Sequence, residues 1–299
     1  MRGLVKAGLL RRYRTDRFQT VYGLTQPGAR WLQEAGVEAK ASVRRVSDMS
    51  NPEHTLWAHF IVLAAEARGL KASTEAELLR ALNTSTADTQ PGKQGLLRVE
   101  GQTPHGTVHH YLRPDAVFDD HDGVAWIEIE RSARGANRAA ALRTLALSVG
   151  AKLVDGRVLR RVVVFTRTER IRGRVMAALR GVAEQTRESA LMRGRRLLKE
   201  VEADSFEVWM TVDRRHTDGR SSLVDKLAGH VIVQELPTWL PRLRLDGRKE
   251  SSTAGWLGEN YLPYRRPLGL PAWETPQSPL LGTAELRGLA GNRPSGYER

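Results

Sequence analysis

Hydrophobic and polar positions through the middle of the chain alternate between helical and strand spacing. Residues 53–69 are dense in Leu, Trp, Phe, Ile and Ala, which predicts a largely buried helix that ends at Gly69. A second helix is expected over 73–82, because Ser73 or Thr74 can cap it and leucines recur on one face. A polar loop follows.

Period-two patterns then predict strands at 96–100, 108–118 and 124–130, the last two joined by the acidic turn DDHDG. We expect these three strands to form an antiparallel meander. Beyond them, the spacing predicts a helix over 136–150, an apolar strand at 160–166, a helix from about 169 to 185 and a strand at 206–212.

An apolar strand between two helices indicates burial on both faces, so the predicted fold class is α/β with a mixed sheet. We assign this domain to residues 50–213, after a polar linker that ends near Asn51. Residues 214–299 contain prolines, tryptophans and few periodic runs, and we expect an irregular C-terminal arm there.

Residues 1–40 show a helix end, a two-stranded turn and a helix capped by Thr25. The motif GLVKAGLLRR…VYGLTQPGARWL resembles the C-terminal half of a winged helix-turn-helix. The resemblance implies a wing that contacts DNA, and its candidate contact residues are Arg11, Arg12, Arg14 and Arg17. The alternative is a small hairpin packed on the main domain.

Composition changes this picture in three ways. A net charge of +13 on 299 residues makes nucleic acid the leading partner. The absence of cysteine excludes disulfides and thiolate zinc sites. No apolar run is long enough to span a membrane and the start does not resemble a signal peptide, so we expect a cytoplasmic protein without a membrane partner.

The positive charge concentrates in residues 160–200, which contain twelve Lys or Arg and four acids. Arg172, Arg174 and Arg180 lie largely outside the apolar stripe of the predicted helix and are candidate phosphate contacts. A solvated helix face that keeps the protein soluble explains the same pattern.

The segments RPDAVF and WIEIERS contain three carboxylates that form a candidate site. Strand alternation places Glu128 and Glu130 on one face, with Ile127 and Ile129 on the other, and Asp115 lies on the preceding predicted strand. Clustered carboxylates repel one another unless a cation or proton lies between them, and Mg²⁺ is the cation we expect. Acids on a solvated strand are the simpler interpretation.

This order of elements resembles the PD-(D/E)XK nuclease superfamily. The resemblance implies that Asp115 and Glu128 bind the metal, that Glu75 is the glutamate of the first core helix, and that Glu130 occupies the position usually held by lysine. A glutamate cannot supply the positive charge of that lysine. Arg131, Arg134 and Lys152 are alternative cations.

A winged-helix remnant followed by TEAEL, LRPDAVF and WIEIERS also resembles the plasmid replication-relaxation and mobilisation accessory family, over roughly residues 3–170. This implies a DNA-binding protein of a mobile element that acts in plasmid mobilisation, replication or transposition. Its partners would be DNA and a relaxase, a transposase or a second copy of the chain.

Two main hypotheses follow. The first is Mg²⁺-dependent nicking of DNA, with catalytic residues Asp115, Glu128, Glu130 and Glu75. The second is a catalytically inactive nuclease-fold scaffold that binds DNA and a relaxase or transposase. A regulator that acts through the wing alone is a third, weakened by the missing recognition helices.

Overall fold

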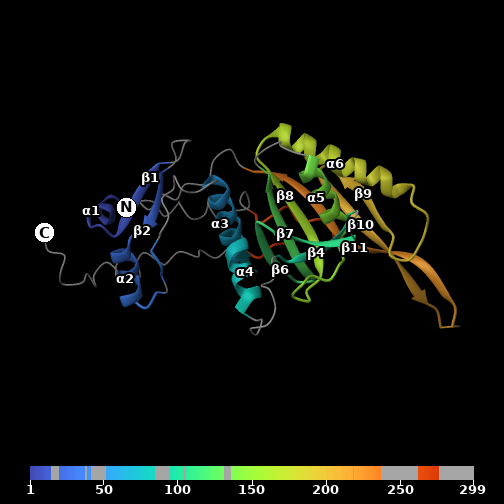
Figure 1. Cartoon of the computed structure of the whole chain (residues 1–299), viewed down its shortest axis with the longest axis horizontal. Coiled ribbons are helices and arrows are strands. Elements are labelled where there is room, and N and C mark those ends of the chain that lie inside the picture. Colours follow the sequence, from blue (N-terminus) through green and yellow to red (C-terminus); the bar gives the residue numbers. More distant parts are fainter. Residues whose placement is uncertain are drawn as a thin grey trace. The chain divides into compact units, whose positions relative to one another are not determined.

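The computed structural model describes residues 1–14, 20–37, 39–41, 52–84, 95–103, 106–130, 136–217, 219–236 and 262–275. These residues divide into two compact units. The first contains the described residues up to Leu56, and the second contains those from Trp57 onwards. Figure 1 labels the helices and strands of both units.

The N-terminal unit is a hairpin flanked by two helices. Helix α1 (Arg2–Lys6) precedes the antiparallel strands β1 (Leu10–Arg14) and β2 (Thr20–Leu24), and α2 (Gln26–Glu34) follows. The predicted cap is confirmed, because Thr25 Oγ1 accepts a hydrogen bond from the Gly28 amide at 3.1 Å. Gly28 also permits close packing, since a Cβ at this position would clash with the carbonyl oxygen of Leu9.

The second unit is built on a seven-stranded sheet in the order β3-β6-β7-β8-β11-β10-β9. Strand β8 is parallel to both β7 and β11, and the other neighbours are antiparallel, which confirms the predicted mixed α/β class. The strands are β3 (Lys71–Thr74), β6 (Ala116–Asp120), β7 (Gly123–Glu130), β8 (Leu159–Thr166), β9 (Arg196–Glu202), β10 (Ser205–Arg215) and β11 (Ser221–Glu235).

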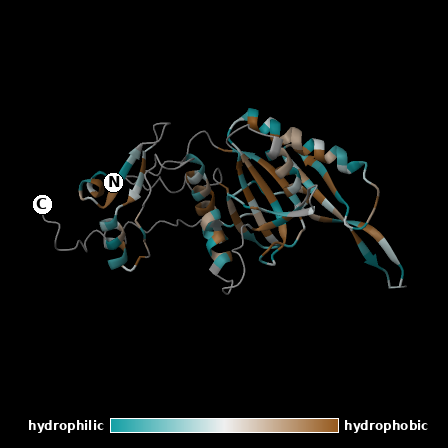
Figure 2. Ribbon diagram, in the orientation of Figure 1, coloured by the Kyte–Doolittle hydropathy of each residue, from teal (hydrophilic) through white to brown (hydrophobic). Residues whose placement is uncertain are grey.

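Both faces of this sheet are covered, as the apolar colouring of its central strands in Figure 2 indicates. Helices α5 (Ala136–Leu147) and α6 (Glu169–Arg187) cover one face, where Val124 and Trp126 of β7 are buried. Helix α3 (Pro52–Glu66) packs on the other face against Ile127 and Ile129. Alternation along β7 therefore sends adjacent side chains into two separate cores.

The predicted three-stranded meander is wrong. Residues 108–118 do not form one strand, because β5 (Gly106–Leu112) pairs only with β4 (Leu97–Thr103) in a separate hairpin, whereas β6 joins the main sheet. Pro114 lies between β5 and β6, and proline can neither donate to a ladder nor leave the preceding residue its usual conformational freedom. The chain bends there.

The predicted helix over 73–82 begins later than expected, since Lys71–Thr74 form β3 and α4 spans Glu75–Thr84. Glu77 explains the boundary. Its Oε2 accepts hydrogen bonds from the amide and hydroxyl of Thr74 at 2.8 and 2.7 Å, which fixes Thr74 as the cap.

The predicted irregular arm over 214–299 is corrected in two places. Strand β11 lies inside the sheet between β8 and β10, and residues 262–275 contribute the fully buried Tyr264 to the α3 face. The Tyr264 hydroxyl donates to Asp120 Oδ2 at 2.5 Å, and Arg266 donates to the same oxygen. Asp120 thus ties a distant segment to the β6–β7 turn.

Among the helices of the described residues, none is long and apolar enough to cross a membrane.

Candidate active site at the carboxyl end of strand β7

Glu128 and Glu130 continue the row begun by Val124 and Trp126, so both face the side covered by α5 and α6. The predicted shared face is confirmed. They occupy the end of β7 where it runs parallel to β8, with Glu128 opposite Val164. The crevice beyond the carboxyl ends of parallel strands is where α/β proteins commonly place their sites.

Asp115 lies just before β6 and bonds to β7 on both sides of Glu128. Its amide donates to the carbonyl of Ile127 at 3.0 Å, and its Oδ2 accepts from the amide of Ile129 at 2.7 Å. Because Pro114 ends the pairing of β6 with β7, β6 does not reach the amide of Ile129. The carboxylate of Asp115 accepts the hydrogen bond from this amide instead. The residue before β6 and a residue of β7, Asp115 and Glu128, are therefore brought together.

This arrangement changes the proton affinity of Glu128. Burial, and next the negative charge of Asp115, raise the pKa of Glu128 to about 8, and Glu130 adds to this effect. The indole N–H of Trp126 opposes it by donating to Glu128 Oε1 at 2.6 Å. A carboxyl held this way carries a proton near neutral pH unless another cation replaces it.

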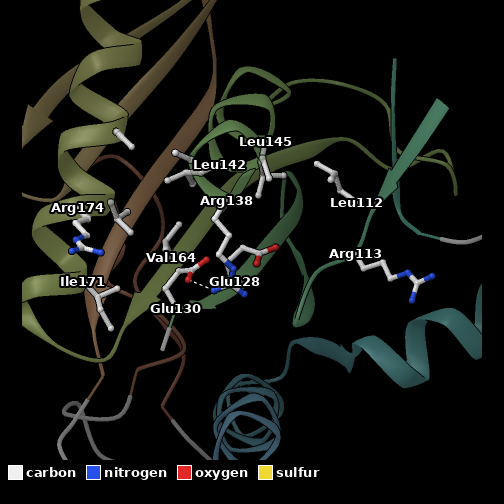
Figure 3. A pocket seen from close by; sticks show the side chains of 14 residues that line it. Leu112, Arg113, Glu128, Glu130, Arg138, Leu142, Leu145, Val164, Ile171 and Arg174 are labelled. Carbon is white, nitrogen blue, oxygen red and sulfur yellow. Dashed lines mark hydrogen bonds and ion pairs between the residues drawn. The ribbon is translucent and has the colours of Figure 1, made fainter. Parts of the chain in front are cut away.

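Glu130 is paired with Arg138, whose guanidinium reaches it from the first turn of α5 (Figure 3). Arg138 therefore supplies a cation close to the position where the superfamily resemblance expects lysine. Arg131 and Arg134 lie outside the described residues. Lys152 bridges to Val158 near the opposite end of β7 and β8 and is not the missing cation.

A cavity of about 310 Å³ opens at this end of the sheet, between α5 and α6 (Figure 3). Its charged lining combines the two glutamates with arginines from three elements, and the rest is aliphatic. The lining residues are Leu112, Arg113, Glu128, Glu130, Arg138, Ala139, Ala141, Leu142, Leu145, Val164, Ile171, Arg174, Val175 and Ala178.

Glu75 contacts the site through its backbone amide and, through its side chain, Arg113 of the cavity lining. Its amide donates to the carbonyl of Asp115 at 3.2 Å, whereas its carboxylate lies 3.6 Å from Arg113 Nη1 and is not part of the described cavity lining. The four predicted acids lie at one end of the sheet, and the charges of Asp115 and Glu130 both act on Glu128.

Comparisons with protein-family models, curated proteins and solved structures found no match to this chain.

Within the described residues, one group of three side chains has ligand atoms that all lie within 4.8 Å of one another, and it is Asp120, His121 and Asp122. Its carboxylates already bind arginine: Arg161 contacts both aspartates, and Arg266 contacts Asp120. Asp115, Glu128 and Glu130 are not such a group.

The predicted DNA contacts on α6 are engaged within the protein. Arg172 pairs with Glu169 at 2.7 Å and with Asp204, and Arg180 pairs with Glu200 at 2.7 Å. Arg174 lines the cavity instead. These pairs reduce the positive charge that α6 offers to phosphate.

On the N-terminal unit, Arg11 and Arg12 are exposed on β1, and Arg12 lines a hollow of about 320 Å³ together with Arg2 and Lys6. Arg14 is the last residue of β1, and its side chain is not described; Arg17 lies outside the described residues.

Sequence reasoning missed Trp126 and Arg138. Trp126 could have been found from its position two residues before Glu128, on the same strand face. No sequence signal selects Arg138, because spacing does not determine which arginine of a crossover helix lies over the strand end.

The raised pKa of Glu128 predicts a pH-dependent stability. The folded state binds this proton more tightly than the unfolded chain, whose ordinary pKa is 4.5, so the stabilising contribution is full below that pH and is lost as pH rises towards about 8. In metal-free buffer, the melting temperature of Glu128→Gln should therefore rise relative to that of wild type as pH increases from 5 to 8. A constant difference across this range would contradict the assignment.

Proposed function

We propose that this protein is a DNA-processing protein of a mobile element, and that its second unit nicks DNA with Mg²⁺ held by Asp115 and Glu128. The observation that carries the proposal is that Asp115, bonded to the Ile129 amide, acts electrostatically on Glu128, and that Glu128 lines a cavity at the carboxyl end of β7. The high net charge supports a polyphosphate substrate.

The topology around the site supports the proposed kinship with the PD-(D/E)XK superfamily. An antiparallel β6–β7 hairpin carries the acids, and β7 connects through α5 to the parallel strand β8. This is the hairpin and crossover order from which the resemblance was drawn. It accounts for acids and arginine meeting at one strand end.

The residues fit a divalent cation. Mg²⁺ is commonly held by one or two carboxylates, with water and substrate phosphate completing its shell, so Asp115 and Glu128 are sufficient protein ligands. The charge of Asp115 that raises the pKa of Glu128 is the same charge that favours a cation there. When bound, the ion supplies Lewis-acid stabilisation for hydrolysis of a phosphodiester.

The remaining groups have positioning and charge roles. Trp126 fixes the carboxylate of Glu128 through its indole N–H, and the Ile129 amide fixes that of Asp115. Arg138 neutralises Glu130 and places a guanidinium at the cavity, where it can hold a phosphate oxygen as negative charge develops. Aliphatic residues on the inner wall restrict water around these groups.

A second candidate function is a catalytically inactive scaffold that binds DNA and a relaxase or transposase. The observation that favours it is the pairing of Glu130 with Arg138, which engages the guanidinium beside the predicted lysine position. In this case the acids have a structural role, and Glu128 carries a proton in place of a metal.

Incubation of supercoiled plasmid with the whole protein separates these candidates. The first predicts open-circular product with Mg²⁺ or Mn²⁺ and none in EDTA, because the paired carboxylates cannot act on phosphate without a cation. DNA binding that leaves the plasmid supercoiled under every metal condition would favour the scaffold and overturn the nicking proposal.

A further inference from the structure

Strands β10 and β11 extend beyond the sheet as a two-stranded ribbon. Pairing of β10 with β9 ends at Met210, and pairing of β11 with β8 begins at His230. Beyond those points the two strands continue to pair with each other, as far as Arg215 opposite Ser221. Figure 1 shows this part as the orange hairpin that projects past the other strands.

The base of the ribbon is tied to the loop before β9. Asp225 accepts hydrogen bonds from Thr211 Oγ1 at 2.5 Å and from Arg195 Nη2 at 2.7 Å, and the amide of Thr211 donates to the carbonyl of Arg195 at 3.0 Å. A bulge after Val208 changes the register of the two strands just before the ribbon begins. The ribbon therefore leaves the sheet at a fixed place.

The tip is also ordered by hydrogen bonds. The amide of His216 donates to the carbonyl of Arg220 at 2.8 Å, and a ring nitrogen of His216 bonds to Ser222 Oγ at 2.7 Å. Gly219 permits the turn, with φ of +81°. Over its described residues the two strands are already paired, so a partner would not have to bring them together.

The exposed end carries three arginines and the two aspartates Asp213 and Asp218. Arg214, Arg215 and Arg220 are exposed, and Figure 2 colours the end of β10 as hydrophilic. Arg214 and Arg215 are neighbours on β10, so their side chains project to opposite faces of the ribbon. The described acids of the ribbon are already paired: Asp213 with Arg193 at 3.2 Å, and Asp225 with Arg195.

We infer that this ribbon is a DNA-binding arm that enters the major groove of double-stranded DNA. A two-stranded ribbon fits the width of that groove, and cations on both of its faces meet the phosphates of both strands. The arginines of α6 that are paired with acids present less positive charge to phosphate than the exposed Arg214 and Arg215. The inference deepens the proposed function but does not depend on cleavage.

The test compares whole-protein variants in binding a 30-base-pair duplex by fluorescence anisotropy. Loss of two phosphate contacts in Arg214→Ala/Arg215→Ala should lower the salt slope of log affinity by about 1.8 and weaken binding roughly 50-fold near ~0.1 M salt. The control Lys71→Ala/Arg143→Ala removes the same charge from exposed positions on β3 and α5 and should bind nearly as wild type.

Methylation of guanine N7 by dimethyl sulfate reports the groove directly, because N7 lies in the major groove. Wild type should protect guanines, and the ribbon variant should not. Wild-type affinity in the ribbon variant, an equal loss in the control, absence of DNA binding by the whole protein, or unprotected guanines would each overturn the inference.

The two proposals can fail separately. A protein that binds DNA through the ribbon and leaves plasmid intact with Mg²⁺ refutes nicking and supports the arm. A protein that nicks plasmid while Arg214→Ala/Arg215→Ala keeps full affinity refutes the arm alone.

Discussion

Asp115→Asn and Glu128→Gln should each lower Mg²⁺-dependent nicking of supercoiled plasmid by at least about 100-fold. Each substitution keeps the size of the side chain and removes the charge that holds the cation, which is worth several kcal/mol of transition-state stabilisation. The side-chain amide oxygen that Asp115→Asn introduces can still accept the hydrogen bond from Ile129, so the strand end should keep its shape.

Glu188→Gln is the matched control, because Glu188 is exposed at the end of α6 and lies outside the cavity lining. It should nick at the wild-type rate. Circular dichroism and DNA affinity should be unchanged in all three variants, so that lost nicking reports the site. Retention of more than a tenth of wild-type nicking by either amide variant would remove that residue from the catalytic site.

Asp120→Ala should destabilise the second unit by about 3–5 kcal/mol, the usual cost of removing one partner from a buried charge cluster. Asp120 accepts bonds from Tyr264 and Arg266, and its Oδ2 lies 3.1 Å from Arg161, whose side chain is fully buried. Although burial opposes ionisation of Asp120, hydrogen bonds from Arg266, Tyr264 and His121 hold its pKa well below the ordinary value. Urea unfolding measures the loss.

Asp213→Ala is the control for this measurement, since Asp213 pairs with Arg193 at the surface, where such a pair contributes about 1 kcal/mol or less. Equal destabilisation by the two variants would show that residues 262–275 are not held by Asp120. Because Asp120 and Glu128 lie at opposite ends of the β6–β7 hairpin, folded Asp120→Ala should still nick.

The local hydrophobic pattern was sufficient to predict features that depend on a single strand or helix. Alternation in WIEIE placed Glu128 and Glu130 correctly, and the apolar stripe of 169–185 located α6. It failed where a single residue redirected the chain: Pro114 divides 108–118 between two sheets, although the flanking residues all suit a strand.

Strand β11 was missed because its first half has no alternation of polar and apolar residues. Ser221–Leu227 lie in the ribbon, where they are exposed or half-buried, and they lack the alternation by which a half-buried strand is recognised. Only the later run around Val231 and Val233 enters the core. A strand that is partly in an exposed ribbon and partly in the core shows no single period of hydrophobic residues.

The acids of the site could be predicted, and its cations could not. A strand fixes the faces of Glu128 and Glu130, but no spacing rule determines which arginine a crossover helix will bring over the strand end. Arg138 fills that place, and the α6 arginines pair with Glu169, Asp204 and Glu200. The tertiary structure determines which acids lie within reach of these long side chains.

Mn²⁺ binding followed by electron paramagnetic resonance tests the central claim most directly, because the signal of the free ion falls as it binds. At pH 8 we predict one bound Mn²⁺ for wild type, none at the same concentration for Asp115→Asn or Glu128→Gln, and weaker wild-type binding at pH 6, where the proton on Glu128 competes. A wild-type protein that leaves the Mn²⁺ free, or amide variants that bind it equally well, would contradict the account.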